Sequence, residues 1–231
     1  MIRAILFDKD GTFTHFHATW DGWMGATLRD LAAASGADVG TLADGVGYDL
    51  DAGRMRPAGT FVTATTRTSV DALARLTGWD AATMASWWLP RLNANPHVAV
   101  PGVAPMVDAL RGQGLRVGVL TNADRAQAEA GLGEIGVLDR LDGIVACDDG
   151  HGAKPDPAGA LAFAASVGVD PAAILVVGDG ATDRDAAAAA GMPFAAVLTG
   201  TLGADAFPDA VVVLDVVTDL PDWLAASANP D

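Results

Sequence analysis

Short runs of apolar residues, each followed by polar or glycine-rich positions, recur along most of the chain. They are four to six residues long and rich in Val, Ile, Leu and Phe, which is typical of strands buried on both faces of a sheet. The runs cover Ile2–Phe7, Leu115–Leu120, Ile144–Cys147, Ile174–Val177, Phe194–Leu198 and Val211–Leu214. Between most of them apolar positions recur at helical spacing, which predicts helices over residues 103–110, 125–135 and 157–167. Strands that alternate with helices predict an α/β fold with a doubly wound, Rossmann-like parallel sheet.

The spacing of the strands is interrupted once, where roughly 85 residues separate Phe13 from Val98 and strands elsewhere lie about 30 residues apart. Three helices are expected in this insertion: from Thr19 as N-cap to Gly36, behind Ser69 to Gly78, and from Asp80 to Pro90. Their apolar faces carry Trp20, Trp23, Met24, Leu28, Leu31, Val70, Leu73, Leu76, Met84, Trp87 and Trp88. We interpret these aromatic residues as the insertion's own core. The expected division is therefore a core domain of residues 1–13 and 99–231 and an inserted α-helical domain of residues 14–98.

Charge and cysteine content narrow the function classes. The 14 basic and 29 acidic side chains give a net charge of −15, which opposes contact with a nucleic-acid backbone. Cys147 is the only cysteine, so the chain can form neither an intramolecular disulfide nor a cysteine-based zinc site. The lack of disulfides fits a reducing compartment, so we expect the protein in the cytoplasm. The uncharged stretch 186–204 is interrupted by glycine and proline, so we expect a helix, a turn and a strand there and no membrane span. The start of the chain lacks the apolar length of a secretory signal, and residues 228–231 are expected to fray.

Two carboxylates follow the first predicted strand, in the sequence Asp8-Lys9-Asp10-Gly11-Thr12. Strand alternation would place Asp8 and Asp10 on one side and turn Lys9 away from both. The carboxyl ends of parallel strands are where such sheets bind ligands. Two carboxylates this close repel each other unless a cation lies between them, and hard oxygen ligands suit Mg²⁺.

Three further motifs follow later strands, and their order is more informative than any one of them. They are Thr121-Asn122, Lys154-Pro155 and Gly178-Asp179-Gly180-Ala181-Thr182-Asp183. Since 27 of the 29 acidic residues are Asp, the last motif arises easily by chance, whereas Asp-x-Asp-Gly-Thr is specific by itself. Taken together, the motifs resemble the haloacid dehalogenase-like hydrolase superfamily, and its phosphoglycolate phosphatase-like members most of all. The resemblance covers essentially the whole chain, because the helical insertion occupies the place of that family's α-helical cap.

The resemblance implies a catalytic role for four residues. Asp8 would be the nucleophile that accepts the phosphoryl group, and Asp10 the acid/base that protonates the leaving oxygen and then activates water. Thr121 would offer a hydroxyl and Lys154 an ammonium group to the charge of the transition state.

The resemblance also implies a Mg²⁺ site and a phosphate site. Asp8, the backbone carbonyl of Asp10 and Asp179 would hold the ion, and Asp183 would orient these ligands. Thr121 and Lys154 would bind the phosphate together with the backbone N–H groups of Gly11 and Asn122.

The function implied is Mg²⁺-dependent hydrolysis of a small phosphorylated metabolite through an aspartyl-phosphate, with 2-phosphoglycolate as the first substrate to consider. A phosphomutase acting on a small sugar phosphate would share every catalytic residue and differ in the cap. A haloalkanoic acid dehalogenase does not need Asp10. A non-catalytic binding or regulatory protein would be expected to lack one of the motifs, and this chain has them all.

Several residues depart from the family pattern or add to it. Lys9 stands where an apolar residue is usual, and His15 where many members have another Asp; for His15 and His17 we favour hinge packing or a substrate contact over a metal site. Residues 14–98 carry a net charge of only −2, from six Arg and eight Asp, which leaves −13 on the rest of the chain. Within this less acidic segment Arg54 and Arg56 form the sharpest basic cluster, which we interpret either as a clamp for an anionic substrate group or as solvated surface charge.

Overall fold

The computed structural model describes residues 1–228, and the expected frayed tail at 229–231 lies outside the described residues. The chain divides into two compact units, one formed by Met1–His15 with the residues from His97 onward, the other by Phe16–Pro96. The first unit thus extends two residues beyond the expected boundary at either side of the insertion. Its departing and returning segments are joined by backbone hydrogen bonds from His15 N to Val98 O and from Val100 N to Phe13 O, each 2.9 Å long.

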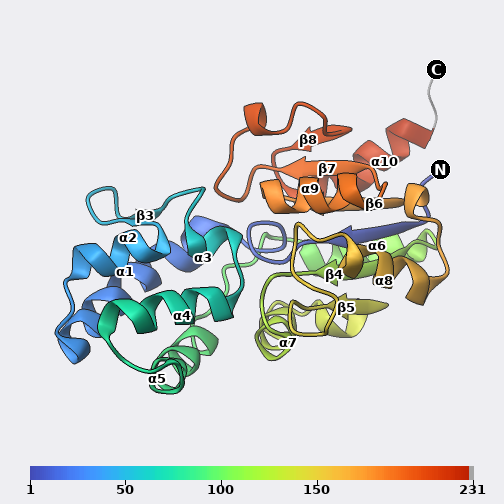
Figure 1. Ribbon diagram of the computed structural model, residues 1–231. Helices are drawn as coiled ribbons and strands as arrows, with labels where there is room; N and C mark the ends of the chain where they lie inside the picture. Colours follow the sequence, from blue (N-terminus) through green and yellow to red (C-terminus); the bar gives the residue numbers. More distant parts are fainter. Residues whose placement is uncertain (229–231) are drawn as a thin grey trace. The chain divides into compact units, whose positions relative to one another are not determined.

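A six-stranded parallel sheet forms the centre of the first unit, which confirms the predicted fold (Figure 1). The strands are β1 (Ala4–Phe7), β4 (Arg116–Leu120), β5 (Gly143–Val145), β6 (Ile174–Gly178), β7 (Phe194–Val197) and β8 (Val212–Leu214). Their order is β5-β4-β1-β6-β7-β8, and β1 is paired on both edges, with β4 and with β6. Each strand coincides, within one or two residues at either end, with an apolar run expected from the sequence.

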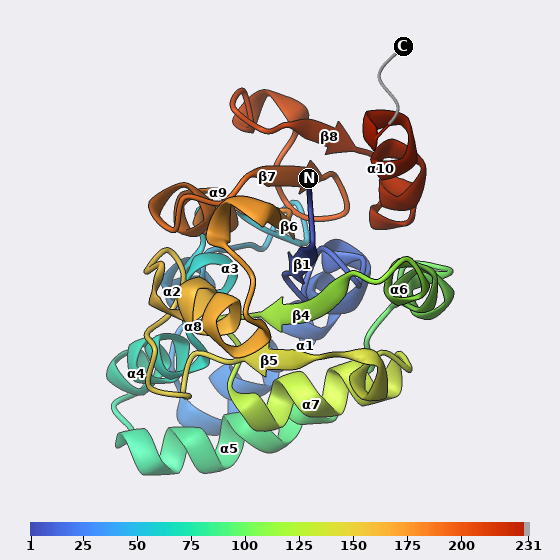
Figure 2. The same cartoon turned by 90° about the vertical axis from the view of Figure 1, so that its right-hand side faces the viewer.

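Helices cover both faces of this sheet (Figure 2). They are α6 (Val103–Gly112), α7 (Arg125–Glu134), α8 (Ala158–Val167), α9 (Ala181–Ala189) and α10 (Leu220–Ala228), with short 3-10 turns at Leu138–Arg140, Pro171–Ala173, Ala204–Ala206 and Val217–Asp219. Alternate residues of each strand serve different cores, as strand geometry requires. Ile5 and Phe7 pack with the apolar residues of α6, α7 and α10, while Ala4 and Leu6 pack with those of α8 and α9.

Strand order determines where ligands can bind. From β1 the chain adds β4 and β5 on one side, then returns to place β6, β7 and β8 on the other. The carboxyl ends of β4, β1 and β6 therefore flank the position where the winding direction reverses, and open α/β sheets bind their ligands at this point.

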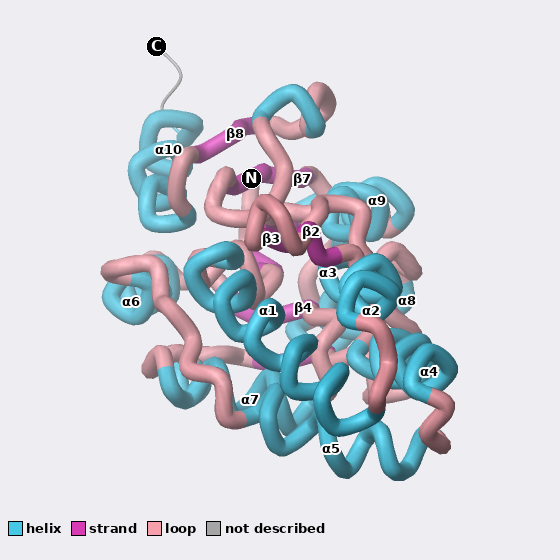
Figure 3. The backbone as a smooth tube through the Cα atoms, turned by 90° about the vertical axis from the view of Figure 1, so that its left-hand side faces the viewer, coloured by secondary structure: helices cyan, strands magenta, loops and turns pink. Residues whose placement is uncertain are grey.

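The second unit is mainly helical (Figure 3). It contains α1 (Phe16–Ser35), α2 (Val39–Val46), α3 (Thr60–Thr63), α4 (Thr66–Thr77), α5 (Ala81–Asn93) and a two-stranded hairpin of β2 (Tyr48–Asp49) and β3 (Arg54–Met55). Its core is separate from those of the sheet and includes Trp20 and Trp88, both fully buried. Trp23 packs in a T-shaped arrangement with each of these rings, at centroid distances of 5.5 and 5.2 Å. The aromatic residues of the insertion are therefore its own core, as expected.

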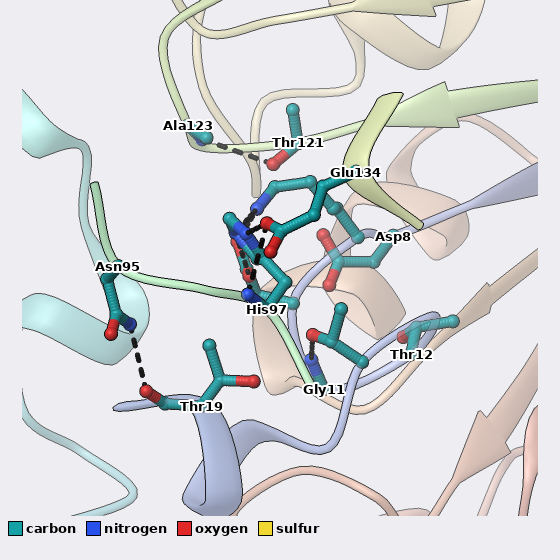
Figure 4. Close-up of polar contacts among 12 residues, drawn as sticks. Asp8, Gly11, Thr12, Thr19, Asn95, His97, Thr121, Ala123 and Glu134 are labelled. Atoms are coloured by element: carbon teal, nitrogen blue, oxygen red, sulfur yellow. Dashed lines mark hydrogen bonds and ion pairs between the residues drawn. The ribbon is translucent and has the colours of Figure 1, made fainter. Parts of the chain in front are cut away.

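Three expected helix ends in this unit were wrong. Helix α1 begins at Phe16, so Thr19 is not its N-cap; it lies buried in the first turn, where its carbonyl accepts a hydrogen bond from Asn95 (Figure 4). Helix α4 begins at Thr66 behind the Thr65 cap, and Ser69 lies inside it. Helix α5 continues past Pro90 to Asn93, because proline removes only its own N–H and the Pro90 carbonyl still accepts from Ala94 N at 3.2 Å.

The uncharged stretch 186–204 forms the end of α9, a turn and β7, as expected from its glycine and proline content, and continues as a loop from residue 198 to the 3-10 turn at Ala204. Within residues 1–228 we find no helix with both the length and the apolar character that a membrane crossing needs.

Candidate active site

Asp8, Lys154 and Asp183 meet at the carboxyl ends of the central strands, although the sequence separates Lys154 from Asp8 by 146 positions. Asp8 directly follows β1, and Asp183 lies in the first turn of α9, which follows β6. The Lys154 ammonium lies 2.5 Å from Asp8 Oδ1 and 2.6 Å from Asp183 Oδ1. All three side chains are buried. The sequence motifs thus come together around one buried ion-paired lysine.

Asp179, which follows β6, adds a third buried carboxylate. Carboxylate oxygens of Asp8, Asp179 and Asp183 all lie within 4.8 Å of one another. The Thr12 hydroxyl donates to Asp179 Oδ1 at 3.3 Å. This group of hard oxygen donors is the kind that Mg²⁺ prefers.

Two glycines leave room for the Asp179 carboxylate. A Cβ at Gly11, where φ is +87°, would lie 2.3 Å from Asp179 Oδ2, and one at Gly200 would lie 1.7 Å from it. The Thr199 hydroxyl donates to Gly11 O at 2.5 Å and so fastens the two glycine segments together. The carboxylate is therefore held between two stretches of backbone that tolerate no side chain.

The electrostatics of this cluster show an excess of negative charge. Burial, supported by the Asp183 charge and opposed by Lys154, raises the pKa of Asp8 to about 7. Burial and the Asp8 charge likewise raise the pKa of Asp179. Although burial acts to lower it, the Asp183 and Asp8 carboxylates raise the pKa of Lys154 above its usual value. One ammonium group does not balance three buried carboxylates, so the donor set fits a divalent cation.

Asn122 holds Lys154 in place through the backbone. Its amide nitrogen donates to Lys154 O at 3.0 Å, and its carbonyl oxygen accepts from Lys154 N at 2.8 Å. The neighbouring Thr121 is buried after β4, and its hydroxyl accepts from Ala123 N at 3.1 Å (Figure 4). The predicted site thus includes one contact the sequence did not suggest, the side chain of Asn122 on the Lys154 backbone.

The prediction that Lys9 turns away from both Asp8 and Asp10 was wrong. Its side chain is fully buried, and Nζ lies 2.7 Å from Asp10 Oδ2 and 3.1 Å from His97 Nε2. Strand alternation does not extend this far: β1 ends at Phe7, and the chain has turned by Gly11. His97 in turn contacts Glu134 through Nδ1, at 3.0 Å (Figure 4).

Arg54, Arg56 and His17 belong to the helical unit and are engaged within it. Arg54 contacts His17 Nε2 at 2.9 Å, and Arg56 forms an exposed ion pair with Asp44 at 3.0 Å. His17 Nδ1 lies 2.9 Å from Asp21 Oδ2. Both ring nitrogens of His17 thus have protein partners, while a substrate contact by either arginine stays a prediction.

Sequence reasoning missed Thr12, His97, Glu134 and Gly200. Thr12 could have been found, since it completes the first motif. Glu134 is one of only two Glu in a chain of 27 Asp, which marks it as unusual. Gly200 is one of 27 glycines and had no distinguishing signal.

Comparisons with known proteins agree with this geometry. The family model for haloacid dehalogenase-like hydrolases matches residues 2–191. A phosphoglycolate phosphatase of Rhodospirillum rubrum is 33% identical over 97% of this chain and 91% of its own length. A validoxylamine A 7'-phosphate phosphatase of Streptomyces hygroscopicus is 30% identical over 95% of this chain and 96% of its own. The structure of CbbY from Rhodobacter sphaeroides in complex with phosphate superposes with a TM-score of 0.71 at 20% identity, covering 95% of this chain and 96% of that one.

The helical unit Phe16–Pro96 is consistent with the α-helical cap that one branch of this family inserts after its first motif. Family match, relatives and fold agree with the order of the motifs along the sequence. The chain therefore belongs to the haloacid dehalogenase-like hydrolases and is a phosphatase, that is, a phosphoric monoester hydrolase.

Proposed function

We propose that this protein is a Mg²⁺-dependent phosphatase that hydrolyses a small phosphate monoester, 2-phosphoglycolate first among them, through an aspartyl-phosphate on Asp8. The observation that carries the proposal is the buried ion-paired cluster in which Lys154 lies 2.5 Å from Asp8 Oδ1 and 2.6 Å from Asp183 Oδ1. Removing an ammonium group from water is costly, so Lys154 is held there by its two carboxylate partners, at the strand ends where open α/β sheets bind ligands.

Asp8 is suited to be the nucleophile. It is fixed by Lys154 and lies at the carboxyl end of the central strand β1. In the first step a carboxylate oxygen of Asp8 forms a bond to phosphorus while the bond from phosphorus to the ester oxygen breaks. Lys154 and the Thr121 hydroxyl would then lie where charge accumulates on the phosphoryl oxygens.

Asp10 is suited to move the proton. Its side chain is 21% exposed, unlike the buried Asp8, and it is held by Lys9 rather than by Lys154. In the first step protonated Asp10 donates to the leaving alkoxide, which departs as an alcohol. In the second step ionised Asp10 takes a proton from water, the oxygen of that water attacks phosphorus, and phosphate leaves with Asp8 restored.

The residues fit a Mg²⁺ site made of Asp8, Asp179 and the backbone carbonyl of Asp10. When bound, the ion would neutralise charge on the transferring phosphoryl group. Asp183 would orient these ligands, since one of its oxygens is taken by Lys154 and the other accepts from Gly180 N at 2.9 Å. Gly11 and Asn122 would supply backbone N–H groups to the phosphate.

The choice of substrate rests on the relatives and on the helical unit. Phosphoglycolate phosphatases are among the curated relatives, but one relative of similar identity is named for a different phosphate ester. In 2-phosphoglycolate the group next to the phosphate ester is a carboxylate, which Arg54 or Arg56 could bind as a charge-assisted pair. We therefore place 2-phosphoglycolate first.

A panel of small phosphate esters, assayed for phosphate release with Mg²⁺ and with EDTA, tests the proposal. We expect release that requires Mg²⁺, is fastest with 2-phosphoglycolate, and is absent in Asp8→Asn. Release that EDTA leaves unchanged would contradict the metal requirement. Isomerisation of a sugar phosphate without release of phosphate would instead identify a phosphomutase.

A further inference from the structure

A fully buried lysine, Lys9, stands beside the proposed acid/base without touching the ion-paired cluster around Lys154. It is one of only two lysines in the chain. Burial of an ammonium group is costly unless its protons are bound, and Lys9 binds Asp10 Oδ2 at 2.7 Å and His97 Nε2 at 3.1 Å. Lys9 therefore ties Asp10 to a second set of residues.

The donor and acceptor roles in this set follow from chemistry. An ammonium group can only donate, so His97 Nε2 must accept from Lys9, and the ring proton lies on Nδ1. That proton is donated to Glu134 Oε2 at 3.0 Å, and the same oxygen accepts from His97 N at 3.1 Å. The chain of contacts from Asp10 to Glu134 thus alternates acceptor and donor without conflict.

Glu134 is held as a carboxylate by these contacts. Although partial burial opposes the shift, the hydrogen bonds from the His97 ring and backbone lower the pKa of Glu134 below its usual value. The imidazole of His97 is only 4% exposed, so its ring has little freedom to turn away from Lys9.

Helix α7 leaves space for the His97 ring at one position. A Cβ at Gly131 would lie 2.9 Å from both Cε1 and Nε2 of His97. Glycine in a helix interior is unfavourable compared with alanine. Its presence at the position that faces the ring is therefore a second observation that the structure accommodates His97 here.

We propose that Lys9, oriented by His97 and Glu134, is a positioning residue that holds the Asp10 carboxylate in the direction needed for proton transfer. The proposal rests on the acid/base role given to Asp10 above. Asp10 is 21% exposed, and a carboxylate at the edge of a site can rotate unless one oxygen is anchored. Lys9 anchors Oδ2, which fixes the plane of the carboxylate.

Lys9→Met tests this role because it removes the charge and keeps most of the side-chain volume. An alkoxide must be protonated to leave, whereas p-nitrophenolate leaves without help, so only the alkyl ester depends on Asp10 in the first step. At saturating Mg²⁺ we expect kcat/KM to fall about 100-fold for 2-phosphoglycolate, or for whichever alkyl phosphate the wild type hydrolyses best, and less than about tenfold for p-nitrophenyl phosphate.

The second step gives an independent readout. Water attack on the aspartyl-phosphate needs Asp10 with either substrate, so in Lys9→Met it should become rate-limiting. We expect a burst of p-nitrophenol whose amplitude approaches the enzyme concentration, followed by slow turnover. A general loss of structure would instead lower kcat/KM by the same factor for both substrates and would give no burst of p-nitrophenol.

A pair of variants on α7 tests the positioning without touching Lys9 or Asp10. Gly131→Ala places a methyl against the His97 ring and must displace it by on the order of 0.5 Å to reach ordinary contact distance. Gly133→Ala is the matched control, since its Cβ would meet only Leu138 Cδ2 at 3.7 Å. In Gly131→Ala we expect kcat/KM for the alkyl ester to fall about 3- to 10-fold while kcat/KM for p-nitrophenyl phosphate changes little. In Gly133→Ala we expect kcat/KM to change by less than about twofold.

The outcomes separate this inference from the proposed function. If the wild type hydrolyses no phosphate ester, the proposed function fails. If it does, the positioning role is overturned when Lys9→Met lowers kcat/KM equally for both substrates and shows no burst of p-nitrophenol. Should Lys9→Met not fold, the α7 pair decides, and indistinguishable behaviour of Gly131→Ala and Gly133→Ala overturns the inference.

Discussion

Gly200→Ala should weaken metal binding by displacing Asp179. The substitution adds one methyl group and removes no polar group from the site. Gly200 lacks a positive φ, so alanine is compatible with its backbone and the effect is steric. The added Cβ would lie 1.7 Å from Asp179 Oδ2 and 2.3 Å from Cγ. Ordinary contact needs about 3.5 Å, so the carboxylate or the turn must move by on the order of 1.5 Å.

A displacement of this size predicts two measurable effects. Disturbance of metal-orienting residues costs about 10- to 100-fold in metal affinity, and we expect a rise of that size in the Mg²⁺ concentration for half-maximal activity. Overpacking costs about 1–3 kcal/mol, which corresponds to a fall in Tm of about 2–12 °C for a chain of this length. The Thr199–Gly11 hydrogen bond resists movement of the turn, so we expect most of the shift in Asp179.

The assay is phosphate release titrated with Mg²⁺, with Tm measured in parallel by calorimetry. Gly203→Ala is the control, because nothing lies within 4 Å of a Cβ at that position, and it should titrate like the wild type. If Gly200→Ala and Gly203→Ala show the same Mg²⁺ dependence, the reasoning that places Asp179 in the metal site is refuted.

Three further predictions concern the nucleophile, the buried charges and the helical unit. Asp8→Asn and Asp10→Asn should both abolish turnover. After incubation with p-nitrophenyl phosphate, whose leaving group needs no proton from Asp10, acid quenching with mass spectrometry should detect a phosphorylated protein only in Asp10→Asn; phosphate on another residue in Asp8→Asn would exclude Asp8 as the nucleophile. Burial raises the folded-state pKa of Asp8 from 3.8 to about 7, so in EDTA the folded protein retains a proton that the unfolded chain has lost. The contribution of Asp8 to stability is therefore complete below about pH 4 and is lost between about pH 4 and 7, by up to ~1.4 kcal/mol per pH unit for one proton. Mg²⁺ should therefore raise Tm more at pH 8 than at pH 5, and equal gains would contradict the buried-charge argument. Arg54→Ala or Arg56→Ala should lower kcat/KM for 2-phosphoglycolate about 10- to 150-fold, as expected for loss of a charge-assisted contact, with little effect on p-nitrophenyl phosphate; Arg67→Ala is the control, and a uniform response returns these arginines to the solvated surface.

The sheet and the residues of the ion-paired cluster could be predicted from the sequence because both depend on apolar runs and on the polar residues that follow them. Doubly buried strands need continuous apolar runs, and ligands bind where those runs end, so Asp8, Thr121 and Asp179 could each be assigned to a strand end. The position of Lys154 followed from its order among the motifs, and the structure brings its ammonium to Asp8.

The remaining contacts depend on geometry that short-range patterns do not encode. Lys9 was assigned by strand alternation, which fails once β1 ends at Phe7. His97 and Glu134 contact each other across 37 positions, and nothing near either residue specifies its partner. Helix α2 and the β2–β3 hairpin were missed because eight and two residues are too few for periodicity to emerge.

The paired segments at the two ends of the insertion have a consequence for how the protein can change. His15 bonds to Val98 and Val100 to Phe13, and Thr14 forms an antiparallel bridge with Ala99, so the chain leaves and re-enters the sheet-containing unit at one place. A short turn could close this gap at little cost in loop entropy, because the two ends are already neighbours. Lengthening, exchanging or deleting the insertion would therefore leave the order and connections of the sheet strands unchanged, and replacing residues 16–96 by such a turn would test whether the sheet-containing unit folds by itself.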